Sequence, residues 1–199
     1  MTERKQIYTG LTCIAWGLFL QYFNLNLGQI NVLPAFAGWF LQLRGCRLLE
    51  GEARDLALLR PFGRIGFLWS LFLWGAACLG LEPGWKSQPL FAALSLVIGI
   101  LDLYFHFQLF TDLADLAERA QPEGDIQNRL LRWRTGQTVT LTAVLLLTAP
   151  PFQRPEWWEH LTNCAAVVCL FAIFWSMMAT FALRKLFFGE TGIEEKMEM

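Results

Sequence analysis

The stretch QIYTGLTCIAWGLFLQYFNLNLGQINVLPAFAGWFLQL, residues 6–43, contains no Asp, Glu, Lys or Arg in 38 consecutive positions. A helix needs about 20 apolar residues to cross a hydrocarbon core about 30 Å thick, so this run is long enough for two crossings. The polar segment NLNLGQIN, residues 24–31, interrupts it, and Pro34 is a residue that favours the first turn of a new helix. The run predicts a tight helical hairpin with spans near 7–23 and 33–49.

The rest of the chain has the same character. Hydrophobic residues make up 55% of it and charged residues 17%, against about 25% in typical soluble proteins. Four further spans are predicted near residues 62–81, 88–111, 135–150 and 159–183. We therefore expect an all-α polytopic integral membrane bundle of six transmembrane helices, forming one domain over 1–188. A short disordered cytoplasmic tail is expected at 189–199, where the sequence is acidic.

The basic residues predict how the bundle is oriented. Six spans with a cytoplasmic N-terminus place 14 of the 16 Lys and Arg residues inside and only Lys86 and Arg154 outside. Such a bias is typical of short cytoplasmic loops. The prediction is a multi-pass protein of the bacterial cell (cytoplasmic) membrane with both termini cytoplasmic. The alternative is a re-entrant second segment. It gives five spans and puts the basic segments 44–64 and 119–134 on the outer side, away from the cytoplasmic N-terminus.

Two ionisable residues inside the fourth span are the first candidates for a functional role. Asp102 is predicted to lie at membrane depth, with His106 one turn later on the same face. An intramembrane carboxylate is costly and should face the bundle interior. The pair is interpreted either as a proton relay or ligand anchor, or as a structural pair that also involves Arg64. The later residues Gln108, Asp112, Asp115 and Arg119 form a stripe that we expect to be a solvated face.

Two further groups of polar residues are weaker candidates. Thr138 and Thr142 share one face of the fifth span with Thr135, and that face either lines a polar cavity with Asp102 or bonds its own backbone. The turn of the predicted hairpin is the other candidate, as a ligand-facing element on the outside. Its polar residues are Asn24, Asn26, Gln29 and Asn31.

Metal and disulfide chemistry are weakly indicated. Glu156, Glu159 and His160 have a spacing that allows a divalent cation site, but no second His accompanies them. We expect no metal and no cofactor. The five cysteines form no C-x-x-C motif. Cys78 and Cys164 fall near the outer ends of their spans, so a disulfide between them is left open, with buried thiols as the default expectation.

Other patterns argue against an enzyme. The chain has no G-x-x-x-x-G-K-[ST], G-x-S-x-G or H-E-x-x-H motif, so we lean towards a non-enzymatic protein. The net charge of −1 gives no reason to expect a nucleic acid partner. Small residues recur at helix-packing spacing, with Gly10 and Gly17 in the first span. They indicate close helix packing within this chain, or a docking face for another membrane subunit.

The stretch INVLPAFAG, residues 30–38, resembles a segment of small, uncharacterised multi-pass membrane proteins of clostridia-like bacteria. Their pattern has Asp where this chain has Ala35, so any role of that carboxylate is absent here. The size, six spans and internal termini are also similar in architecture to the substrate-binding S subunits of energy-coupling-factor transporters. Neither resemblance implies an activity.

These expectations favour a solute-binding or transport subunit that works with a partner. Its expected partners are the lipid bilayer, a membrane protein subunit and a small-molecule solute. The alternative is a structural or accessory membrane protein without a ligand, which docks through its small-residue helix faces.

Overall fold

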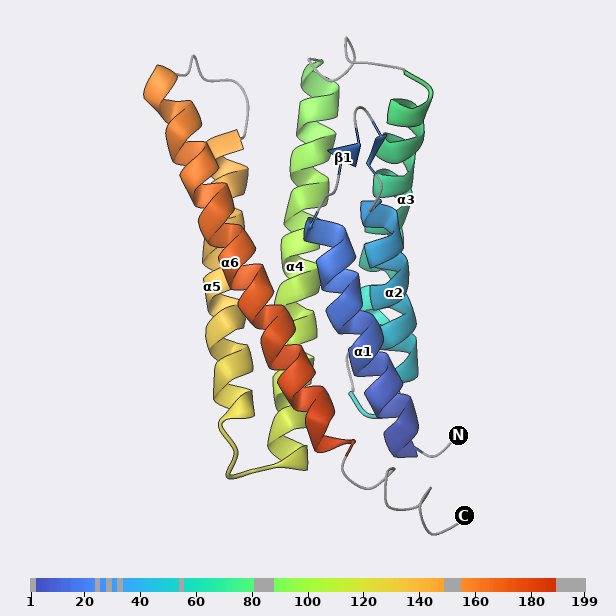
Figure 1. Ribbon diagram of the computed structural model, residues 1–199. Helices are drawn as coiled ribbons and strands as arrows, with labels where there is room; N and C mark the ends of the chain where they lie inside the picture. Colours follow the sequence, from blue (N-terminus) through green and yellow to red (C-terminus); the bar gives the residue numbers. More distant parts are fainter. Residues whose placement is uncertain are drawn as a thin grey trace.

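Helices account for almost all of the described structure. The computed structural model describes residues 3–23, 26–27, 30–31, 34–53, 56–80, 88–148 and 155–188. Its elements, in chain order, are α1 (Glu3–Tyr22), β1 (Asn26–Leu27), β2 (Ile30–Asn31), α2 (Ala35–Leu48), α3 (Leu56–Cys78), α4 (Pro89–Ala120), α5 (Ile126–Thr148) and α6 (Glu156–Leu186). The six helices run up and down along a common direction, and the start of α1 lies at the same end as the end of α6 (Figure 1).

Neighbouring helices in the sequence are also neighbours in space. Each helix packs on the next, and α6 packs back on α1, so the bundle closes into a ring. Helices α1 and α4 are not backbone neighbours in this ring. They meet instead through long side chains in its interior, which is where the candidate site lies.

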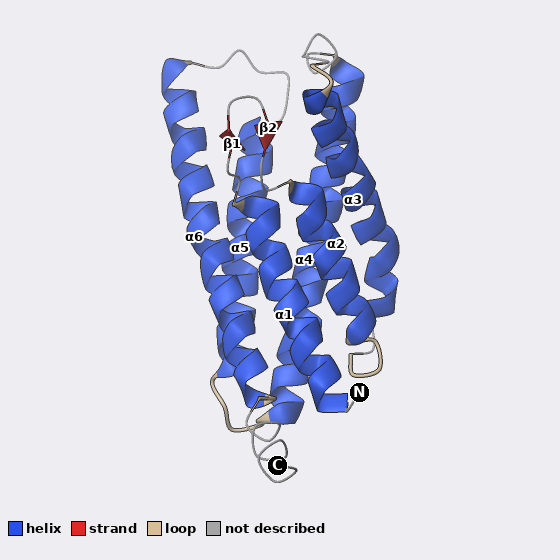
Figure 2. Cartoon of the chain, turned by 45° about the vertical axis from the view of Figure 1, so that its right-hand side comes forward, coloured by secondary structure: helices blue, strands red, loops and turns tan. Residues whose placement is uncertain are grey.

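The hairpin predicted from residues 6–43 is present. Helix α2 returns antiparallel along α1, and between them β1 and β2 pair antiparallel, with Asn26 opposite Asn31 (Figure 2). This two-stranded ribbon is the only sheet in the described part of the chain. At about 1.5 Å per residue the 14 residues of α2 extend about 21 Å, which is shorter than a full hydrocarbon crossing.

Three helices have the length and composition of membrane spans. Helices α3, α4 and α6 are long and apolar enough to cross a bilayer. Large apolar side chains point outward from all three, such as Leu68, Leu90 and Phe171. Such exposed faces are costly in water and expected in lipid. Helix α1 begins with charged residues and α5 carries three arginines in its first half, which lowers their mean hydropathy.

Two helix boundaries differ from prediction. The third span is predicted to begin near residue 62, but α3 begins at Leu56 and runs through Pro61. Proline this close to a helix start removes a single backbone hydrogen bond, and the complete burial of Leu56 and Leu59 offsets that loss. Helix α5 likewise begins at Ile126 rather than near 135, because buried Leu130 packs into the core ahead of the apolar run.

Candidate functional site: a buried polar centre

The polar centre comprises Gln21 and Tyr22 of α1, Gln42 of α2, and Asp102 and His106 of α4. The Gln21 side chain donates from Nε2 to Asp102 Oδ1 at 2.9 Å, and the Tyr22 hydroxyl donates to Asp102 Oδ2 at 3.0 Å. Both carboxylate oxygens of Asp102 are therefore held by α1. The Asp102 side chain is still 19% exposed, so it is not sealed by these contacts.

Gln42 extends this network to α2. Its Nε2 donates to Gln21 Oε1 at 2.6 Å, in a fully buried contact. Two glycines make the contact possible. A Cβ on Gly17 would lie 2.6 Å from the Gln42 side chain, and a Cβ on Gly38 would lie 2.6 Å from the Gln21 backbone nitrogen. The missing side chains let the helix backbones approach closely.

His106 is oriented by the residue one turn before it. Its Nδ1 lies 2.9 Å from the Asp102 carbonyl oxygen and 3.1 Å from Asp102 Oδ1. A carbonyl oxygen can only accept, so Nδ1 carries a proton in the neutral and in the charged imidazole. The neutral ring then presents a lone pair at Nε2. Nε2 is buried, and no described residue is its hydrogen-bond partner.

Aromatic rings surround the imidazole. The ring centroids of Tyr22, Trp39 and Phe105 lie 5.6, 5.8 and 5.2 Å from that of His106. Their faces and edges are arranged around a side chain that is 2% exposed. The imidazole is therefore packed among aromatic rings from α1, α2 and α4.

Two glutamines add further unpaired polar atoms. Gln137 of α5 is 1% exposed and lies beside the Tyr22 hydroxyl. Neither its Nε2 nor its Oε1 has a hydrogen-bond partner among the described residues, and the same holds for Gln42 Oε1. Leaving one buried donor or acceptor unpaired costs about 1–3 kcal/mol. Several such atoms around one carboxylate are therefore unusual for a purely structural cluster.

The chemistry available here is recognition and proton transfer. Asp102 and His106 form a carboxylate–imidazole pair that is able to share a proton, and Tyr22 connects to both, with its hydroxyl 3.4 Å from His106 Nδ1. The unpaired His106 Nε2 and Gln42 Oε1 are acceptors, while the Gln137 amide offers both a donor and an acceptor. Such a set binds a ligand that carries hydrogen-bond donors.

Other predicted site residues lie apart from this centre. The Thr138 hydroxyl bonds to the Arg134 carbonyl at 2.8 Å, and the Thr142 hydroxyl bonds to the Thr138 carbonyl at 2.7 Å. Both hydroxyls are thus occupied by their own helix. Arg64 is exposed and lines a groove with other arginines, so it is not the partner of Asp102.

The outer-turn candidates are only partly described. Asn26 and Asn31 pair in the β-ribbon by their backbones. Asn24 and Gln29 lie outside the described residues, as does the tail at 189–199.

The metal and disulfide candidates are not assembled in the described part of the chain. No group of three His, Cys, Asp or Glu side chains there could hold a metal ion. Glu159 and His160 are both exposed, and the side chain of Glu156 is outside the description. All five cysteines are free, with Cys78 and Cys164 exposed at their separate helices.

Sequence reasoning missed part of the centre and misplaced one carboxylate. Gln21, Gln42 and Gln137 were not candidates, although a glutamine inside an apolar run is itself a signal because its burial is costly. Asp112 was expected on a solvated face, but it is 5% exposed and accepts a hydrogen bond from Gln108 Nε2 at 2.9 Å. Part of the C-terminal half of α4 faces the core. The stripe that was predicted to be solvated is therefore buried at Asp112 and exposed at Asp115 and Arg119.

No family model, curated protein or solved structure matches this chain.

Proposed function

We propose that the chain is a multi-pass membrane protein that binds a small polar solute at the polar centre, as a solute-binding or transport subunit. The observation that carries the proposal is His106 Nε2, which is buried and has no partner among the described residues. Its neighbour Asp102 is held by two hydrogen bonds yet remains accessible. Ionisable groups at membrane depth mark ligand and proton pathways more often than structural sites.

The proposed solute carries N–H or O–H groups. A donor facing His106 Nε2 satisfies the neutral imidazole, and a second donor satisfies Gln42 Oε1. Gln137 pairs with a group that both donates and accepts. An ionised Asp102 additionally favours a positively charged solute such as an amine, because an opposite charge offsets the cost of a buried carboxylate.

The membrane arrangement we propose has six crossings with both ends of the chain in the cytoplasm. The basic ends of α2, α3 and α5 then share the cytoplasmic side, as the positive-inside rule requires. Helices α1, α2 and α5 are less apolar than the other three, so the proposal that they cross rests on the distribution of basic residues.

The alternative of an accessory protein without a ligand rests on small-residue docking faces. Many of these residues are already used inside the chain. Gly10 faces Leu49, Gly66 faces Trp39 and Gly99 faces Leu145. This internal use favours the solute-binding proposal, which does not depend on such faces.

The test is small-molecule retention. The wild-type protein and Asp102→Asn are extracted from native membranes in mild detergent, and released compounds and bound proteins are identified by mass spectrometry. Asp115→Asn is the matched control, because it removes an exposed carboxylate from the same helix. We expect a compound with amine or hydroxyl groups from the wild type and the control, reduced at least tenfold in Asp102→Asn. Identical spectra from all three proteins would overturn the proposal.

A further inference from the structure

A groove lined by arginines lies between α2 and α3. Its volume is about 450 Å³. Arg44 and Arg47 come from the last turns of α2, and Arg60 and Arg64 come from the first turns of α3. Four guanidinium groups around one cavity form a concentrated positive charge, which is a ready site for an anion.

Most of this charge is uncompensated. Arg60 forms an ion pair with Glu50. For Arg44, Arg47 and Arg64 the described residues provide no ion-pair partner, and all three are exposed. Like charges that face one another repel, so a bound anion stabilises the arrangement more than it would stabilise an isolated arginine.

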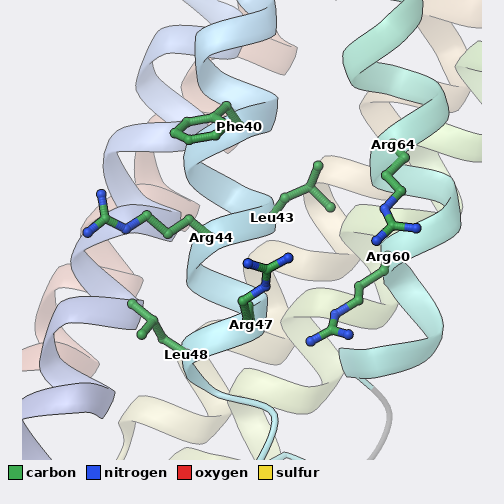
Figure 3. A pocket seen from close by; sticks show the side chains of 7 residues that line it. All are labelled: Phe40, Leu43, Arg44, Arg47, Leu48, Arg60 and Arg64. Atoms are coloured by element: carbon green, nitrogen blue, oxygen red, sulfur yellow. The ribbon is translucent and has the colours of Figure 1, made fainter.

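Three of the four arginine side chains also have a common direction (Figure 3). Figure 3 shows the guanidinium groups of Arg47, Arg60 and Arg64 directed into the space between the two helices, whereas Arg44 extends to the other side of α2. Planar guanidinium groups match the oxygens of a phosphate through paired hydrogen bonds. Three of them converging from two helices predict a phosphate-bearing ligand rather than a single carboxylate.

The groove has an apolar wall on the side away from the chain ends. Phe40 and Leu43 form it, and Phe40 is 56% exposed. Phe40 precedes Arg44 and Arg47 on α2, so it lies deeper along the proposed membrane span. A ligand that fills the groove therefore meets arginines from both helices and the apolar side chains of Phe40 and Leu43 (Figure 3).

We infer that this groove binds the phosphate headgroup of an anionic phospholipid, with an acyl chain against Phe40 and Leu43. Basic pockets between transmembrane helices on the cytoplasmic side are suited to acidic lipid headgroups. The inference rests on the membrane location in the proposed function and is independent of the solute site. A soluble phosphate carries the same charged group but has no acyl chain to contact Phe40 and Leu43.

Lipid binding is measured by native mass spectrometry of the detergent-solubilised protein. Phosphatidylglycerol, phosphatidylcholine and inorganic phosphate are titrated separately. The variant Arg47→Gln/Arg64→Gln removes two charges and leaves the Arg60–Glu50 pair intact. Arg132→Gln, an exposed arginine on α5, is the matched control. We expect the double variant to bind phosphatidylglycerol about 30-fold more weakly, equivalent to about 1 kcal/mol for each arginine, with the control unchanged.

Each outcome decides the inference. Equal binding of the two lipids by the wild type overturns it, as does unchanged phosphatidylglycerol binding by the double variant. Inorganic phosphate that binds as tightly as phosphatidylglycerol overturns the lipid assignment. If the double variant does not fold, Arg64→Gln alone is compared with Arg132→Gln in the same titration. Asp102→Asn should bind phosphatidylglycerol as the wild type does. The lipid titration therefore tests the groove separately from the solute site. Extraction of the protein by carbonate would instead refute the membrane location itself.

Discussion

Gly17 and Gly38 lie so close together that a Cβ on Gly38 would be 2.6 Å from the Gly17 carbonyl oxygen. A second glycine pair, Gly10 and Gly45, lies seven residues away on each helix and has the same close approach. A Cβ on Gly45 would be 2.7 Å from the Gly10 carbonyl oxygen. These two glycine pairs bring α1 and α2 together, and the contact at Gly17 and Gly38 places Gln21 next to Gln42.

Substitution of Gly38 should destabilise the protein. Gly38→Ala puts a methyl group against the backbone of α1, which cannot move away as a side-chain tip would. Overpacking of this kind costs about 1–3 kcal/mol, more than the gain of about 1 kcal/mol in helix propensity. We expect a melting temperature several degrees lower in detergent, measured by tryptophan fluorescence.

Gly75→Ala is the control for that substitution. Gly75 lies in α3 and a Cβ there would meet nothing within 4 Å. The change should leave the melting temperature unchanged or raise it slightly, because alanine is the better helix former. Equal effects at Gly38 and Gly75 would contradict the close helix contact.

The hydroxyl of Tyr22 should contribute measurably to stability. Tyr22→Phe removes the donor to Asp102 Oδ2 and keeps the ring that packs on His106. Hydrogen bonds to charged groups contribute about 1.5–3 kcal/mol, and we expect a loss in that range in equilibrium unfolding. Tyr104→Phe is the matched control, since Tyr104 is exposed and its ring packs on Phe62. A loss of equal size in both variants would show that Asp102 does not depend on this hydroxyl.

The sequence indicates some parts of this centre better than others. Asp102 and His106 were found because ionisable residues inside an apolar helix are conspicuous, and their spacing of four places them on one face. Their partner Gln21 could not be found in this way. Helix periodicity shows which residues share a face, but it does not show which other helix that face meets.

Local hydrogen bonding explains why the second alternative for the threonines, bonding to their own backbone, is the one observed. Thr138 and Thr142 have the right spacing for a polar face, yet each hydroxyl bonds to the carbonyl four residues earlier. That acceptor is always within reach in a helix and competes with any tertiary partner. Asp112 was misplaced for the opposite reason, because its burial depends on core packing at the lower end of α4 and not on its neighbours in the sequence.

The Glu52 carboxyl, at the chain's predicted cytoplasmic end, should make stability depend on pH. A hydrogen bond with the Glu3 carboxyl, with some desolvation, raises the pKa of Glu52 above its ordinary value. The folded state thus favours protonated Glu52. This contribution is present below the ordinary pKa near 4.5 and is lost as the pH rises through the higher folded-state pKa.

Glu52→Gln should remove that pH dependence, because the amide donates to Glu3 at any pH. The melting temperature of the variant relative to the wild type should therefore rise between pH 4 and pH 7. The change should be at most about 4 °C, since exposed pairs contribute about 1 kcal/mol or less. Glu123→Gln, in the turn between α4 and α5, is the control and should show no trend. A difference that stays constant across this pH range would count against the shared proton.

The number of membrane crossings follows from the side on which each loop lies. Single cysteines are placed at Gly51, Gly124 and Phe188 with the native cysteines replaced, and sealed vesicles are labelled with an impermeant maleimide.

Six crossings put all three positions in the cytoplasm. If only the three most apolar helices, α3, α4 and α6, cross, Phe188 moves to the outside while the other two stay inside. A re-entrant α2 gives five crossings and moves all three outside. A fourth variant that keeps only native Cys78, which is exposed at the far end of α3, is the control: it should be labelled from outside in the first two cases and from inside in the third. We expect the first pattern, because it alone keeps the arginines of α2, α3 and α5 and the basic end of α6 together on the cytoplasmic side.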